Sequence, residues 1–236
     1  MDLCDINQIK ALLARHGFRF SKSMGQNFLI QSWVPADIAH SSGAAPGKGV
    51  LEVGPGIGPL TRELSARADK VVSVELDKAL YPILAETLAD RDNVEIVPGD
   101  ILKTDIAALA AEKFAGLDAI ACANLPYNIT TPAITALIEA GCFSAITVMI
   151  PARASLGMVE PKAAVRPLSR VLRRWAKAAR TTRKKKSASS TSAGAGRGTS
   201  RRTEEVTLGA GMKHSGGTSK SSSQWAWYWQ YREKAP

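Results

Sequence analysis

The 236-residue sequence has few cysteines and no long apolar run, and both absences narrow the classes of protein to which it can belong. Its three cysteines, Cys4, Cys122 and Cys142, have no metal-ligand spacing, so we expect free thiols in a reducing compartment, with no disulfide framework and no bound metal. No apolar stretch approaches the ~18 residues of a membrane span, and the N-terminus lacks the apolar core of a signal peptide. We therefore expect a cytoplasmic protein without a membrane segment.

The net charge of +10 is distributed unevenly along the chain. Residues 1–150 contain 12 Lys and Arg against 17 Asp and Glu, whereas residues 151–236 contain 19 against 4. The second part also has no Ile, Phe, Asp, Asn or Cys, and only eight Leu and Val. Such a composition is typical of disordered segments. We therefore expect N-terminal helices over 1–48, an α/β core over 49–150 and a basic low-complexity tail over 151–236.

Helical and strand patterns alternate through the first part of the chain. Apolar residues at helical spacing, each run followed by glycine, predict helices over 5–16 and 30–42. Beyond them the patterns predict strands 50–53, 70–75, 93–97, 117–123 and 145–150, and helices 59–68, 78–89, 104–113 and 131–140. This alternation predicts a parallel sheet with helices on both faces, joined by right-handed crossovers.

A glycine-rich turn follows the first predicted strand. Gly54, Gly56 and Gly58 allow a tight backbone turn and a close approach of a ligand, and Pro59 suits the first turn of the next helix. The second predicted strand ends at Glu75, close to the spacing at which a carboxylate meets ribose hydroxyls. The G-x-G-x-G spacing differs from the G-x-G-x-x-G dinucleotide fingerprint, which favours a nucleoside cofactor over NAD. A tight turn without a ligand is the alternative.

Two further strand ends carry polar residues. Gly99 and Asp100 follow the third strand, and Asn124-Leu-Pro-Tyr127 follows the fourth. Ligands of parallel sheets lie at the carboxyl ends of the strands, so four strand ends are expected to form one site. Separately, Asp100 could cap the following helix and the Asn124 segment could be a simple turn.

Five segments in this order give residues 1–150 a resemblance to the ribosomal RNA adenine N6-dimethyltransferases, which are class I methyltransferases with a Rossmann-like sheet. The segments are Gly25-Gln-Asn-Phe-Leu29, Glu52 to Thr61, Val74-Glu-Leu-Asp77, Gly99-Asp-Ile101 and Asn124-Leu-Pro-Tyr127. The lead-in from Lys22 and the segment Asn124 to Ile129 look more like the bacterial small-subunit enzyme than the large-subunit methylases.

The resemblance implies S-adenosylmethionine as cofactor and N6,N6-dimethylation of adjacent adenines near the 3′ end of 16S rRNA. Its cofactor-binding residues would be Asn27, Leu29, Gly54, Gly56, Glu75, Asp100, Ile101 and Asn124, with Glu75 on the ribose and Asp100 on the adenine amine. The catalytic residues would be Asn124, Leu125, Pro126 and Tyr127, where Tyr127 stacks on the target base. The implied partner is the precursor of the small ribosomal subunit, bound by a monomer.

The resemblance ends after Ile150, where residue types and periodicity change together. We hypothesise that the tail is an out-of-frame or spliced-on translation, which the nucleotide sequence would test. The expected sheet is then incomplete, with the fifth strand as an uncovered apolar edge. In the tail, residues 168–175 could form a basic amphipathic helix, residues 187–223 resemble a flexible linker, and the aromatic segment 225–231 resembles an exposed end or a platform for stacked bases.

Three other functions remain open from the sequence. The chain could be a non-catalytic or inactive relative that binds cofactor and ribosomal RNA, and this reading predicts RNA binding that falls steeply with salt. It could also be a large-subunit rRNA adenine methylase, or a nicotinamide-dependent oxidoreductase on a similar sheet. An unfolded remnant is the last alternative, which a cooperative unfolding transition would exclude.

Overall fold

The structure is a computed structural model that describes residues 1–18, 29, 32–126, 128–151, 204–211 and 226–233. Five parallel strands form the centre: β1 (Lys48–Val53), β2 (Lys70–Glu75), β3 (Val94–Pro98), β4 (Asp118–Asn124) and β5 (Ala145–Pro151). Their order is β3-β2-β1-β4-β5, and all four pairings between them are parallel. The α/β class and the parallel sheet predicted from the sequence are therefore confirmed.

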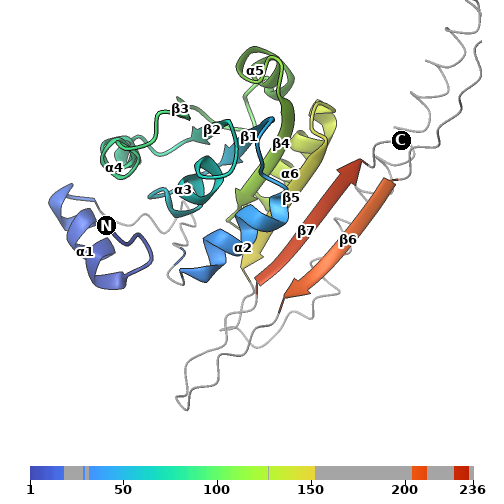
Figure 1. The fold of residues 1–236 in the computed structure, drawn as a ribbon. Coiled ribbons are helices and arrows are strands. Elements are labelled where there is room, and N and C mark those ends of the chain that lie inside the picture. The colour runs from blue at the N-terminus through green and yellow to red at the C-terminus, as the bar shows by residue number, and fades with distance from the viewer. Residues whose placement is uncertain (19–28, 30–31, 127, 152–203, 212–225, 234–236) are drawn as a thin grey trace, which may run out of the picture.

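Helices cover both faces of this sheet (Figure 1). One face packs against α2 (Trp33–Ser42) and α3 (Pro59–Ser65), and we call it the α2/α3 face. The other packs against α5 (Ile106–Lys113) and α6 (Thr130–Ala140), and we call it the α5/α6 face. A third apolar cluster joins α1 (Ile6–Arg15) to α4 (Tyr81–Thr87).

Some boundaries differ from the prediction. The region predicted as one helix over 78–89 forms a 3₁₀ turn, η2 (Lys78–Leu80), followed by α4, which begins again with Tyr81 and Pro82. Proline lacks the N–H of a continuous helix but fits a first turn, which explains the division. The second helix begins at Trp33, and α3 ends at Ser65. Cys4, Cys122 and Cys142 are free, as expected.

The fifth strand is not the uncovered edge that the sequence led us to expect. An antiparallel strand, β7 (Ala226–Glu233), pairs with β5, and β6 (Glu204–Gly211) pairs with β7, so the sheet has seven strands in the order β3-β2-β1-β4-β5-β7-β6. Figure 1 shows this pair beside β5. Thus β6 lies within the predicted linker and β7 overlaps the aromatic segment. The possible helix over 168–175 lies outside the described residues.

Candidate functional site

The carboxyl ends of the central strands lie side by side. Val53 at the end of β1 pairs with Val74 of β2 and with Ala123 of β4. Glu75, the last residue of β2, pairs with Pro98 of β3. The residues that follow these positions therefore meet at one edge of the sheet, as the sequence predicts.

A cavity of about 220 Å³ opens at this edge. It is lined by every described residue that the sequence proposes for the site: Leu29, Gly54, Gly56, Glu75, Asp100, Ile101, Asn124, Leu125 and Pro126. The other two candidates, Asn27 and Tyr127, lie outside the described residues. The structure thus brings the separate motifs together around one space.

The glycine turn forms one wall of the cavity. Gly54, Gly56 and Gly58 all have positive φ, at 68°, 62° and 97°, which side-chain-bearing residues rarely adopt. A Cβ atom on Gly58 would also lie 3.2 Å from the Thr87 Oγ1 and 3.3 Å from the Leu88 Cδ2. The end of α4 therefore packs directly behind the turn.

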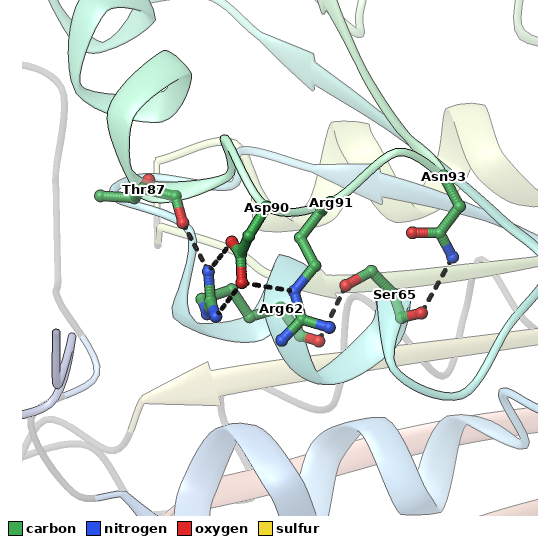
Figure 2. A network of polar contacts seen from close by, with 6 residues as sticks. All are labelled: Arg62, Ser65, Thr87, Asp90, Arg91 and Asn93. Atoms are coloured by element: carbon green, nitrogen blue, oxygen red, sulfur yellow. Dashed lines mark hydrogen bonds and ion pairs between the residues drawn. The ribbon is translucent and has the colours of Figure 1, made fainter.

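A polar network holds α3, the helix after this turn, against the segment between α4 and β3 (Figure 2). The Arg62 guanidinium donates to the Thr87 carbonyl at 2.7 Å and to both carboxylate oxygens of Asp90, at 2.5 and 2.8 Å. The Asn93 amide donates to the carbonyls of Ser65 and Ala68, at 2.9 and 3.0 Å. The glycine turn is therefore braced by contacts outside the cavity.

Glu75 is only 6% exposed and forms part of the cavity lining. One of its carboxylate oxygens accepts the Asp77 N–H at 2.7 Å. Burial raises the pKa of Glu75, while hydrogen bonds from the backbone of Asp77, Gly56 and Leu76 act against the rise. Because one of these donors is Gly56, the carboxylate connects the end of β2 to the glycine turn.

Asp100 lies in the turn between β3 and α5. Its Oδ1 accepts the Leu102 N–H at 3.0 Å, and its carbonyl accepts the Thr104 hydroxyl at 2.9 Å. The residue that caps α5 is Asp105, which accepts the Ala108 N–H at 3.0 Å. The alternative in which Asp100 caps the following helix is therefore wrong. Asp100 lines the cavity, and its Oδ2 lies 3.8 Å from the Lys103 Nζ.

The segment after β4 is fixed through its backbone. The Leu125 N–H donates to the Met149 carbonyl of β5 at 3.1 Å, and the Pro126 carbonyl accepts the Thr130 hydroxyl at 2.8 Å. Leu125 is 1% exposed. These contacts hold the backbone on either side of the Leu125 carbonyl in one position beside Asn124.

Sequence reasoning missed two kinds of cavity residue. Leu76 and Leu102 are large apolar side chains that stay 55% and 41% exposed while they line the cavity. Asp77 and Glu52 add two acidic groups to Glu75 and Asp100. Each leucine closely follows an acidic residue at a strand end, and this pattern could have indicated the site. The same pattern also occurs in ordinary surface turns.

The electrostatics of the lining are one-sided. Four acidic residues line the cavity, and no Lys, Arg or His is among the described residues that do so. Glu52 is 1% exposed and accepts the Ser73 hydroxyl at 2.6 Å. Burial, and to a smaller extent the charge of Glu75, raises the pKa of Glu52 to about 7, while the hydroxyls of Ser73 and Thr61 oppose the rise. The lining suits a ligand with positive charge.

The part of the chain that the structure describes lacks the features of two other types of site. No helix there is long and apolar enough to cross a bilayer. No group of three or more His, Cys, Asp or Glu side chains there is arranged to hold a metal ion.

Comparisons with known proteins agree on one family. A family model described as ribosomal RNA adenine dimethylase matches residues 17–175, which extends past Ile150. The ribosomal RNA small subunit methyltransferase A of Geobacillus thermodenitrificans is 43% identical over 166 residues, covering 70% of this chain and 54% of that protein. The protein of the same name from Alkaliphilus metalliredigens is 46% identical over 133 residues, covering 56% and 46%. The chain spans about half the length of these relatives.

Solved structures share the fold. The 23S rRNA methyltransferase ErmE has a TM-score of 0.55 at 22% identity, with 89% of this chain and 70% of that chain covered. A dimethyladenosine transferase from Plasmodium falciparum has a TM-score of 0.50 at 18% identity, with 86% and 62% covered. The Rossmann-like methyltransferase fold expected for the core is therefore confirmed.

Proposed function

The chain belongs to the ribosomal RNA adenine dimethylase family, and we propose that it uses S-adenosylmethionine to dimethylate N6 of adjacent adenines near the 3′ end of 16S rRNA. Family membership implies a methyl-donor cofactor and an rRNA substrate. The names of the relatives favour the small subunit over the large-subunit methylases. The observation that carries the proposal is the acid-lined cavity, where the motifs of the family meet.

The residues of the cavity fit this cofactor. The methionine part of S-adenosylmethionine carries an ammonium, a carboxylate and a sulfonium and so has a net positive charge, and four acidic residues line the cavity. Leu76, more than half exposed, and Ile101 offer apolar surface for an adenine. A dinucleotide would instead place a negatively charged pyrophosphate here, which the acidic lining disfavours, so the oxidoreductase alternative is weakened.

Each cofactor-binding residue has a proposed role. Glu75 accepts the two ribose hydroxyls, and Asp100 accepts the exocyclic amine of the adenine through the oxygen that its own turn does not use. Gly54 and Gly56 let the backbone approach the cofactor, and a Cβ on Gly54 would meet no protein atom within 4 Å. Asn27 and Leu29 cover the methionine or sugar part.

The bound cofactor supplies an electrophilic methyl group on sulfur. The N6 of adenine is a poor nucleophile because its lone pair is delocalised into the ring. The Asn124 side-chain oxygen and the Leu125 carbonyl accept the two N6 hydrogens and so turn the lone pair toward the methyl group, while Pro126 and Tyr127 hold the extruded base. The backbone bonds around Leu125 fix this carbonyl before the substrate arrives, so positioning supplies most of the rate.

We further propose a cytoplasmic monomer that needs no metal and acts on the precursor of the small subunit. Residues 1–48 would cover the cofactor, 49–150 would bind it, and the part of the basic region 151–236 beyond the family match at residue 175 would be a non-native or frameshifted tail. A cofactor-binding protein without transferase activity is the second candidate, because the chain spans about half the length of its relatives.

The first test is calorimetric titration of the full chain with S-adenosylmethionine. Wild-type protein should bind saturably, and Asp100→Ala should lose most of the affinity. Asp105→Ala makes the same chemical change at the cap of α5, outside the cavity lining, and should keep the affinity. Absence of binding to folded wild-type protein would refute the cofactor assignment.

A second test separates catalysis from binding. Methyl transfer to precursor small subunits should be lost in Asn124→Ala while cofactor affinity falls much less. Cofactor binding without transfer by the wild-type chain would favour the non-catalytic candidate.

A further inference from the structure

Glu52 belongs to a row of polar residues on the α2/α3 face of the sheet. It pairs in register with Ser73 of β2 and Cys122 of β4, and Cys122 pairs with Thr147 of β5. All four are at most 1% exposed. Glu52 is the member of this row that also lines the cofactor cavity. It is therefore a carboxyl group shielded from solvent but adjacent to the ligand space.

Among the described residues, no positively charged group contributes to stabilising the ionised form of Glu52. Ser73 donates a hydroxyl hydrogen bond to Glu52 from β2. Glu75 on β2 contributes negative charge. On β4, burial raises the pKa of the Cys122 thiol, which stays neutral and hydrogen-bonds with Ser42 of α2. Near neutral pH, Glu52 is thus divided between its protonated and ionised forms.

We propose that Glu52 distinguishes the charged cofactor from its neutral product, by releasing its proton when the sulfonium form binds in the cavity. This inference rests on the proposed function. In the transfer, the S–CH₃ bond breaks with its electron pair left on sulfur, the N6 lone pair forms the new bond to carbon, and N6 gives a proton to water. The sulfonium charge is thereby lost from the site.

The charge difference has a direct consequence for binding. A sulfonium in the acid-lined cavity favours the ionised form of Glu52. By thermodynamic linkage, ionisation of Glu52 strengthens binding of the sulfonium form by the same free energy. The thioether product carries no positive charge on sulfur and therefore does not favour the ionised form of Glu52. Glu52 then takes a proton back from water, and the attraction that held the substrate form is absent when the product must leave.

The test is calorimetric titration of the full chain with S-adenosylmethionine and, separately, S-adenosylhomocysteine, in two buffers of different ionisation enthalpy at pH 7. With a pKa of about 7, Glu52 should release about half a proton on binding S-adenosylmethionine and almost none on binding the product. The dissociation constant for S-adenosylmethionine should be about tenfold larger at pH 6 than at pH 8, because only the ionised fraction is competent.

Glu52→Gln is the matched variant, since it keeps the shape and an acceptor for Ser73 but cannot ionise. In this variant the two ligands should release equal numbers of protons. Protons from the amino groups of the ligands remain in the variant, so the comparison with wild type subtracts them. Ser73→Ala provides an independent check, because loss of the hydroxyl donor should move the midpoint of the pH dependence upward.

Each outcome decides the inference. Greater proton release with S-adenosylmethionine, lost in Glu52→Gln, supports it. Equal proton release with both ligands, or a difference that persists in Glu52→Gln, overturns it while leaving the proposed function intact. Binding of neither ligand overturns the proposed function and this inference together.

Discussion

The same strands build both faces of the sheet, but with different kinds of residue. On the α5/α6 face, buried residues of β1, β2, β4 and β5 form one continuous apolar cluster with the helices. On the α2/α3 face, the buried polar residues Ser73, Glu52 and Thr147 lie in one row with Cys122, which belongs to the apolar cluster of this face. The first face is apolar throughout, although Ile101 and Leu125 of its cluster also line the cavity. The second contains buried polar groups next to the cavity, as expected where function limits packing.

The largest effect is expected on the apolar face. Ile134 of α6 is fully buried in its cluster, so Ile134→Ala should lower the free energy of unfolding by about 2–5 kcal/mol, through lost burial and a residual cavity. Urea unfolding followed by circular dichroism measures this change. Thr131→Ala on an exposed position of the same helix is the control and should change little. A loss below about 1 kcal/mol would contradict the packing of α6 described above.

On the α2/α3 face, replacing the buried Glu52 should raise the free energy of unfolding at high pH instead of lowering it. The pKa of Glu52 is raised from its usual 4.5 to about 7, so the folded state holds a proton that the unfolded state has released between these values. Stability should therefore fall as pH rises through this window, by about 3 kcal/mol in total. Glu52→Gln should remove this fall and be the more stable protein at pH 8. Equal pH dependence of unfolding in variant and wild type would refute the prediction, and the exposed Glu139→Gln is the control.

A smaller effect should follow from filling space on the apolar face. A Cβ on Gly49 would lie 2.2 Å from Cδ1 and 2.6 Å from Cγ of Phe114, so the ring must move in Gly49→Ala. We expect a loss of about 1–3 kcal/mol in unfolding free energy. Unfolding of the pair Gly49→Ala with Phe114→Leu tests the cause. If the two costs simply add, the contact with Phe114 is not the reason for glycine here.

The smallest effect is expected at the solvent-exposed end of the network in Figure 2. Hydrogen bonding to Arg62 lowers the pKa of Asp90 to about 2, so the pair stabilises the fold above the usual pKa of 3.8 and loses this effect as pH falls toward 2. The Asp90 side chain is 60% exposed. Asp90→Asn should lower the melting temperature slightly in dilute buffer and hardly at all in 1 M salt, where the pair is screened. A salt-independent loss would show that packing is responsible.

The central sheet could be predicted from sequence because its signals are local. Buried apolar runs at β1, β2 and β4, which end beside Gly54, Glu75 and Asn124, predicted both the strands and the edge of the sheet at which the motifs meet. The division at Pro82 was within reach of the same reasoning. The position of β7 was not, because Ala145 pairs with Arg232, and pairing across such a distance leaves no mark in either segment.

The candidate site was predicted less completely than the sheet. Glycine, Glu75, Asp100 and Asn124 were found because their types and spacing are distinctive. Leu76 could not be distinguished from an ordinary surface leucine, because its role in the site depends on the cavity that it lines. Glu52 was seen within a motif, but its shifted pKa depends on Ser73 and on complete burial, neither of which a single sequence reveals.

The pairing of β5 with β7 also sets a delay during synthesis of the chain. Ala145 emerges 87 residues before its partner Arg232. At translation rates of about 5–20 residues per second, β5 waits roughly 4–17 s for its neighbour. During this interval the hydrogen-bonding groups along β5 are open to any other extended segment, so a chaperone that shields them would raise the yield of folded protein.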